Sequence, residues 1–206
     1  FRLVVREVAA AHGMHATFMP KPLEGVQGSG MHTHLSIFRG DENAFFDGDD
    51  DYYLSDFAKS FMAGLLHHAA EITAITNQTV NSYKRLVPGF EAPIHISWAR
   101  NNRSGLIRVP IPKRGSSNAT RLEYRSPDPA CNPYLAFALI LAAGLKGVEE
   151  EYDLPPEAEA NLFELTDEEL AKLGIEQLPQ SLSDALRVME RSELVLDTLG
   201  EHIFEW

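Results

Sequence analysis

Residues 31–38 read MHTHLSIF, and the alternation of polar and apolar side chains in this octet predicts a half-buried β-strand. Successive side chains of a strand point to opposite faces, so His32, His34 and Ser36 are expected to share one face. Two imidazoles and a hydroxyl beside the glycine-rich loop 25–30 suit a metal ion or phosphate oxygens. Because His-x-His is short and common, an ordinary half-exposed strand with polar residues on one side is the alternative.

The pentapeptide RLEYR at 121–125 predicts a second strand, with Leu122 and Tyr124 toward the core. Its other face would carry Arg121, Glu123 and Arg125. A glutamate between two arginines is compatible with surface ion pairs alone. The other interpretation is that this face lines an active site. Glu123 would then bind a divalent cation, and the arginines would bind carboxylate or phosphate groups, whose paired oxygens match the two parallel N–H donors of a guanidinium group.

Two more arginines, Arg103 and Arg108, lie on the strand candidate that precedes this one. Four arginines on adjacent strands would repel one another unless an anion lies among them, which favours the functional interpretation. A polyanion together with a cation indicates a nucleotide with magnesium. The chain has neither a GxxxxGK[ST] loop nor a GxGxxG run, so a P-loop and a Rossmann site are excluded. The residues alone therefore indicate an enzyme that acts on phosphates and carboxylates with a divalent metal.

Around these strands the sequence alternates between helical and extended patterns. Apolar periodicity and capping residues predict helices at 2–12, 55–76, 132–148, 167–173, 181–190 and 192–205. Short strands are expected at 15–19, 31–38, 94–98, 105–110 and 120–125. Helices outside a set of short strands predict an α+β architecture.

Composition narrows the class of protein further. The 206 residues carry a formal net charge of −12 and a single cysteine, Cys131. These values argue against a nucleic-acid partner and exclude a disulfide framework, and no apolar run is long enough for a membrane span. We expect a reducing, cytoplasmic environment.

The charge is distributed unevenly along the chain. Residues 149–206 have 17 acidic and 3 basic side chains, whereas residues 84–125 have nine Lys or Arg and two Glu. The basic stretch predicts a site for small anions.

Four segments carry a resemblance to a known family: KPLEGVQGSGMHTHLS (21–36), NSYKRLVPGFEAP (81–93), NNRSGLIRVP (101–110) and RLEYRSPDPACNPYLAFALILAAGL (121–145). Together they resemble the catalytic domain of glutamine synthetase, type I. The resemblance implies that residues 1–206 are part of a single catalytic domain, truncated at both ends, with 149–206 as its acidic helical C-terminal part. It also implies an antiparallel sheet packed with helices.

The resemblance implies a reaction as well. The family ligates ammonia to L-glutamate with ATP, through a γ-glutamyl phosphate, and uses Mg²⁺ or Mn²⁺. The expected partners are ATP, glutamate and ammonium, within a homo-oligomer that is a dodecamer in the family; no nucleic acid or membrane partner is expected. One alternative is a γ-glutamyl ligase that uses a polyamine or another amine on the same scaffold. Another is a noncatalytic relative, which the retained charged residues argue against. Because family sites form between subunits and most metal ligands lie elsewhere, the 206-residue fragment alone is expected to be inactive.

By the same resemblance each candidate residue acquires a role. The metal ligands would be His32 and Glu123, which we expect within about 5 Å of each other because both would bind one cation. Glutamate would be bound by Gly28, Arg85, Glu91, Arg103 and Arg125. ATP would be bound by His34, Ser36, Arg103, Arg108 and Arg121. Glu91 and Arg103 would be catalytic, with Glu91 taking a proton from ammonium. The chain departs from the family at Gln27, where relatives usually have asparagine. Relatives also place a lysine in the loop between Arg108 and Arg121, and Lys113 is the candidate for that lysine here.

Overall fold

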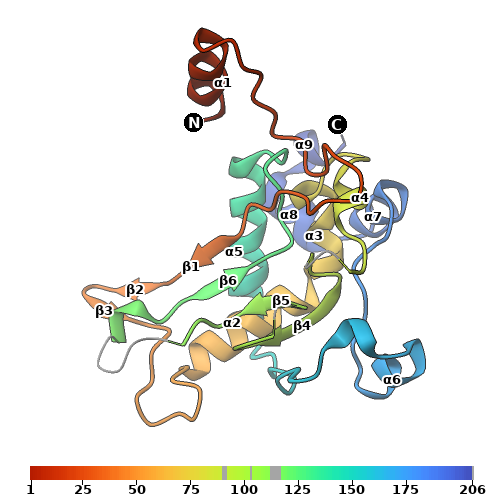
Figure 1. The fold of residues 1–206 in the computed structure, drawn as a ribbon. Coiled ribbons are helices and arrows are strands. Elements are labelled where there is room, and N and C mark those ends of the chain that lie inside the picture. The colour runs from red at the N-terminus through yellow and green to blue at the C-terminus, as the bar shows by residue number, and fades with distance from the viewer. Residues whose placement is uncertain (90–91, 103, 112–116, 206) are drawn as a thin grey trace.

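A computed structural model describes residues 1–89, 92–102, 104–111 and 117–205 (Figure 1). A four-stranded sheet lies at its centre, in the order β1 (Thr33–Leu35), β6 (Leu122–Tyr124), β5 (Gly105–Arg108) and β4 (His95–Ala99). A two-stranded sheet of β2 (Phe38–Arg39) and β3 (Glu42–Asn43) follows β1. Helices pack around the central sheet, so the predicted α+β class is confirmed.

The direction of one strand pair differs from the expectation. β1 pairs with β6, and β6 with β5, in antiparallel fashion, whereas β4 and β5 are parallel. The sheet is therefore mixed, and the expectation of an antiparallel sheet was wrong for this pair. The chain from Ala99 to Gly105 is much shorter than the dozen or so residues that usually join parallel strands, so nothing in the sequence pattern indicates a parallel pair here. The predicted strand at 15–19 is also wrong, because no described strand pairs with it.

Two long helices form the centre of the helical layer. The predicted helix 55–76 is divided at His68 into α2 (Asp56–His67) and α3 (Ala69–Thr76), and α5 spans Pro133–Glu149. α2 and α5 approach closely because glycines line the contact. A Cβ on Gly64 would lie 2.2 Å from the Ala143 carbonyl oxygen, and one on Gly147 would lie 2.3 Å from that of Ser60. Such distances are tolerated only where no side chain exists.

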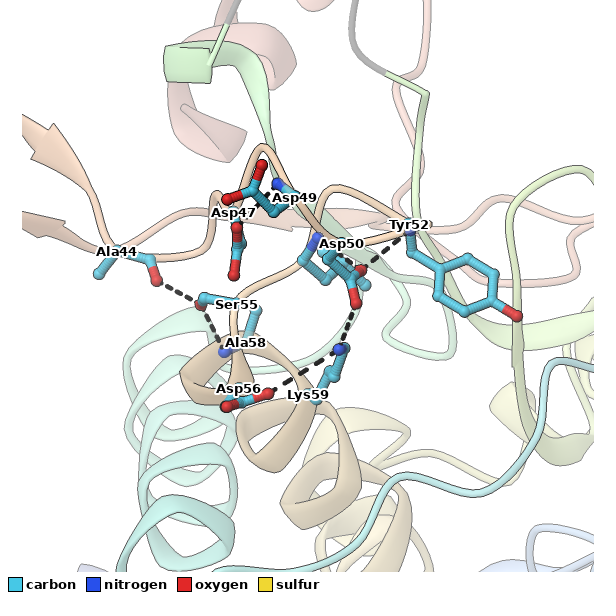
Figure 2. Close-up of polar contacts among 10 residues, drawn as sticks. Ala44, Asp47, Asp49, Asp50, Tyr52, Ser55, Asp56, Ala58 and Lys59 are labelled. Carbon is cyan, nitrogen blue, oxygen red and sulfur yellow. Dashed lines mark hydrogen bonds and ion pairs between the residues drawn. The ribbon is translucent and has the colours of Figure 1, made fainter.

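The loop before α2 is tied to the start of that helix (Figure 2). The Ser55 hydroxyl accepts a hydrogen bond from the Ala58 amide at 3.1 Å and donates one to the Ala44 carbonyl at 2.6 Å, so Ser55 is the N-cap of α2, which confirms the predicted helix start at residue 55. Asp50 accepts from the Tyr52 amide at 2.9 Å and forms an ion pair with Lys59 on α2. The carboxylate of Asp50, in the acidic turn 47–51, thus finds its partners within the same chain.

The remaining helices are short. They are α1 (Arg2–Ala11), α4 (Ser82–Arg85), α6 (Asp167–Lys172), α7 (Leu182–Met189), α8 (Glu193–Leu199) and α9 (Glu201–Phe204), with 3₁₀ turns at Ser117–Ala119 and Leu162–Glu164. One hydrophobic core joins the helices to the sheet, and Phe61, Leu139 and Tyr124 are fully buried in it. Within the described ranges no helix is both long and apolar enough to cross a membrane.

Candidate functional site

The register of β1 against β6 brings the two predicted polar faces together. His32, His34 and Ser36 are exposed and alternate with half-buried neighbours, as the octet predicts. His34 lies directly opposite Glu123, and the His32 Nδ1 approaches Glu123 Oε1 to 2.9 Å. The expectation that His32 and Glu123 converge within about 5 Å is therefore confirmed.

Glu123 is the centre of this charge cluster. Its carboxylate is 3 % exposed. Arg108 Nη1 lies 2.8 Å from Oε2, and Arg125 Nε lies 3.9 Å from Oε1. A carboxylate removed from water is stable as an anion only when cations and donors surround it, and here two arginines and a histidine do so. The strand register produces the arrangement, because Arg108 on β5 is the cross-strand partner of Glu123.

The state of His32 suits a metal ligand. Burial lowers the pKa of His32, the positive charge of Arg125 lowers it further, and Glu123 opposes both. A neutral imidazole retains a lone pair for a cation, and the Glu123 carboxylate supplies an oxygen. The described residues contain no group of three or more His, Cys, Asp or Glu side chains that could hold a metal ion. The pair therefore fits two positions of a divalent-cation shell, and water or residues outside the described ranges would supply the rest.

A second group of polar side chains extends along the same face. Arg121 Nε lies 3.3 Å from His34 Nδ1, and Arg121 Nη1 donates to the Ala119 carbonyl at 3.1 Å. Ser36 is exposed on the same side of β1. Together with Arg108, these residues present cations and hydrogen-bonding groups to solvent, which is the chemistry that phosphate oxygens require.

Arg85 and the glycine-rich loop form the other side of the site. Arg85 is 4 % exposed, and burial lowers its pKa to about 10, so it remains a cation at pH 7. A Cβ on Gly28 would lie 2.4 Å from the Pro20 carbonyl oxygen, and one on Gly30 would lie 2.5 Å from Arg85 Nη2 and 2.9 Å from His32 Nε2. Only glycine leaves room for this close approach of the loop.

Arg125 is the second buried arginine of the site, with its Nε 3.9 Å from Glu123 Oε1. It is 5 % exposed, and its Nη1 donates to the Gly105 carbonyl at 3.2 Å. The Arg125 carbonyl accepts a hydrogen bond from Arg85 Nη2 at 3.1 Å, so the two residues are neighbours, and the positive charge of Arg125 lowers the pKa of Arg85. Two buried cations held near each other favour a bound anion such as a carboxylate.

Three predicted residues, Glu91, Arg103 and Lys113, lie outside the described residues, and their roles stay predictions. Sequence reasoning missed Asn77 and Asp128, which are completely buried behind Arg85. The available signal was the position of these polar residues, one at the end of an apolar helix and one in the turn SPDPA.

The cluster lies apart from a large cavity among the helices. That cavity, of about 930 Å³, lies between α3, α5, α7 and α8 and is lined by residues such as His68, Glu71, Lys146 and Ser192. None of the candidate site residues lines it. The candidate residues argue for the sheet face instead, because His32, Arg108 and Arg125 all lie within ion-pair distance of the buried Glu123 there.

The chain was compared with known protein families and curated proteins. All residues, 1–206, match the family described as glutamine synthetase, catalytic domain. The chain is 57 % identical over 206 residues to a glutamine synthetase of Mycolicibacterium smegmatis and 54 % identical over 204 residues to one of Thermotoga maritima. These alignments cover 100 % and 99 % of this chain but only 46 % of either relative. The chain thus spans a little less than half the length of these relatives.

Solved structures agree with this assignment. GmaS without ligand matches with a TM-score of 0.84 at 42 % identity, covering 98 % of this chain and 44 % of that one. GmaS in complex with ADP matches with a TM-score of 0.83 at 41 % identity, covering 97 % of this chain and 45 % of that one. The fold, the polar face of the sheet and the match over every residue lead to one conclusion: the chain belongs to the glutamine synthetase family, as part of its catalytic domain.

Proposed function

We propose that the full-length protein ligates ammonia to L-glutamate at the expense of ATP, through a γ-glutamyl phosphate. The observation that carries the proposal is the convergence of the His32–Glu123 pair, at 2.9 Å, with Arg108 and Arg125 beside Glu123, and with Arg85 against the glycine-rich loop. Phosphoryl transfer depends on positioning and on neutralisation of charge, and this cluster supplies both.

In the first step a γ-carboxylate oxygen of glutamate attacks the terminal phosphorus of ATP, and ADP leaves. Arg85, next to Gly28, and Arg125 would hold the carboxylates of glutamate through paired N–H donors. Arg108, Arg121, His34 and Ser36 would orient the phosphates. A divalent cation, Mg²⁺ or Mn²⁺, held by His32 and Glu123 would neutralise charge on the transferred phosphoryl group.

In the second step ammonia attacks the activated carbonyl carbon, and phosphate leaves. Glu91 would remove the proton that ammonium must lose, and Arg103 would stabilise the negative charge that develops on the acyl phosphate. These two roles rest on the family resemblance of the segments around Glu91 and Arg103.

We further propose that the full-length protein is a cytoplasmic homo-oligomer, a dodecamer as is typical of the family, without nucleic-acid or membrane partners.

Gln27 supports one alternative substrate. A glutamine at the position where relatives usually have asparagine is longer by one methylene, which changes the wall of the amino-acid site. A γ-glutamyl ligase for a polyamine or another amine is therefore the second candidate.

The test is an assay of the full-length protein with ATP, glutamate and one amine at a time. Phosphate release and the amide product are measured with ammonium, with methylamine and with a polyamine such as putrescine. We expect kcat/KM to be highest for ammonium, with glutamine as the product. A higher kcat/KM for another amine would replace the main proposal with the second candidate, and an absence of ATP-dependent product with every amine would exclude both.

A further inference from the structure

A network of buried polar side chains lies directly behind Arg85. Asn77, the residue that ends α3, is completely buried. Its Nδ2 donates to the Ser126 carbonyl at 2.8 Å and to Asp128 Oδ2 at 3.0 Å, and its Oδ1 accepts from the Thr76 hydroxyl at 2.9 Å. Both amide hydrogens and the amide oxygen are in use, so the side chain is held in one orientation.

The chemistry of the partners determines that orientation. The Ser126 carbonyl and an ionised Asp128 can only accept hydrogen bonds, so the amide nitrogen of Asn77 must face them. An oxygen in its place would stand against two other oxygens inside the protein, where unpaired or repelling polar groups are costly. The position therefore requires an asparagine, and an aspartate of the same shape would not serve.

The Ser126 carbonyl links this network to the candidate site. It also accepts a hydrogen bond from Arg85 Nη1 at 2.6 Å, while Arg85 Nη2 donates to the Arg125 carbonyl at 3.1 Å. Asn77 and Arg85 thus bind the same oxygen from two sides. The guanidinium of Arg85 is placed by the backbone of residues 125–126, and that backbone is placed by Asn77.

Asp128 completes the arrangement. It is completely buried, and its Oδ1 accepts from the Ala130 amide at 2.9 Å, while its backbone amide donates to the Thr76 carbonyl at 3.3 Å. The negative charge of Asp128 also favours the cationic form of Arg85. The end of α3 and the turn 126–130 therefore form one rigid support behind the arginine.

We infer that Asn77 is a positioning residue for glutamate binding: it holds the Ser126 carbonyl so that the Arg85 guanidinium lies against the glycine-rich loop at Gly30, where a Cβ would come within 2.5 Å of Arg85 Nη2. Asn77 touches no substrate in this scheme and acts only through the backbone and Arg85. The inference rests on the proposed function, which assigns glutamate binding to Arg85 and Arg125.

The substitution Asn77→Asp in the full-length protein tests this inference. It keeps the shape of the side chain but places an oxygen against the Ser126 carbonyl and Asp128. We expect the KM for glutamate to rise about 10- to 100-fold, the range typical of residues that orient a binding group, with the KM for ATP changed less than about 2-fold. Thr76→Val removes the hydrogen bond to the Asn77 oxygen, together with a longer one to the Thr73 carbonyl at 3.4 Å, and should raise the KM for glutamate about 3- to 10-fold.

Thr73→Val is the matched control. Thr73 is a buried residue of the same helix whose hydroxyl donates to the Ala69 carbonyl at 2.7 Å, away from the 125–130 turn. It should lower the thermal midpoint without changing the KM for glutamate. An unchanged glutamate KM in Asn77→Asp, or equal rises in the glutamate and ATP KM values, would overturn the inference. If Asn77→Asp does not fold, Thr76→Val decides by the same criterion.

Crystal structures of the full-length wild type and Asn77→Asp separate this inference from the proposed function. We expect the Arg85 guanidinium to leave the Ser126 carbonyl in the variant. If the wild type makes no glutamine, the proposed function fails, and a displaced Arg85 would still support the positioning role. An Arg85 that keeps both backbone hydrogen bonds in the variant would refute that role whatever the activity.

Discussion

Glu123 shows how much of the candidate site depends on a single side chain. Its buried carboxylate lies 2.9 Å from His32 Nδ1 and 2.8 Å from Arg108 Nη1. Removal of one member of such a buried group leaves the others with uncompensated charge. The proposed metal site and the arginines proposed to bind phosphate are therefore coupled through one residue, and neither is independent of the other.

Glu91→Ala in the full-length protein tests whether this single residue is the proposed proton acceptor. The metal-binding pair and the described arginines stay in place, so ATP and glutamate should bind with near-normal affinity. Loss of general-base catalysis should reduce ammonium-dependent glutamine formation by at least about 10²-fold. Steady-state kinetics with varied ammonium measures the effect, and unchanged turnover at saturating ammonium would remove Glu91 from the mechanism.

His95 provides a prediction about pH and stability. It is 2 % exposed on β4, and burial lowers its pKa below the usual 6.5, with Asp167 acting in the opposite direction. Below about pH 6.5 the unfolded chain binds a proton that the folded chain does not, so His95 costs stability as the pH falls from there toward its folded-state pKa. We expect the thermal midpoint of the full-length protein to fall more between pH 7.5 and pH 5.5 than that of His95→Gln. Equal decreases would show that His95 does not contribute.

At the scale of elements, the contact between α2 and α5 holds the helical layer together. Gly64 on α2 and Gly147 on α5 lie against each other's backbone, with the Gly147 amide nitrogen 2.7 Å from the place of a Gly64 Cβ. Helices whose contact surface consists of glycine approach more closely than the usual 8–10 Å between axes. α5 carries Asn132 at its N-cap, directly after the turn 126–130, so this packing also supports the site.

Gly64→Ala should therefore destabilise the full-length protein, although alanine is the better helix former. The added methyl group would lie 2.2 Å from the Ala143 carbonyl oxygen, and the helices would have to separate. We expect a loss of about 1–3 kcal/mol in the free energy of unfolding, seen as a lower thermal midpoint. Asp56→Ala, at a fully exposed position of the same helix, is the control and should change stability by less than about 0.5 kcal/mol. A midpoint for Gly64→Ala equal to that of the control would contradict the close contact.

At the scale of the whole molecule, α1 lies apart from the body, connected by an extended segment (Figure 1). None of its residues is buried, and Leu3, Val4 and Val8 are more than half exposed. Arg2 donates a hydrogen bond to the Cys131 carbonyl and so ties the helix to the start of α5. An amphipathic helix is stable chiefly when its apolar face is packed, which the described residues do not provide for α1.

The isolated chain of 206 residues should accordingly be inactive. It spans 46 % of its curated relatives, and its described residues supply two donors for a cation that takes about six ligands. We expect no ATP-dependent glutamine formation above background from this chain, whereas the full-length protein is active under the same conditions. Turnover by the isolated chain would show that residues 1–206 contain a complete site.

The sequence by itself determined the polar face of the site and the class of the fold. Alternation in MHTHLSIF and RLEYR placed His32 and Glu123, with Arg121 and Arg125, on the polar face, because side-chain direction in a strand depends only on position along the chain. Capping residues such as Ser55 located the helix starts for the same local reason.

Only the tertiary structure decided the features that depend on distant segments. The parallel pairing of β4 with β5 is set by packing, and the division of the helix at His68 is not marked by a proline or glycine. The hydrogen bond from Asn77 to Ser126 joins residues 49 positions apart. The alternation of polar and apolar residues along a strand predicts which face a side chain is on. It does not predict which distant residue will lie opposite, because the packing of the whole molecule determines that pairing.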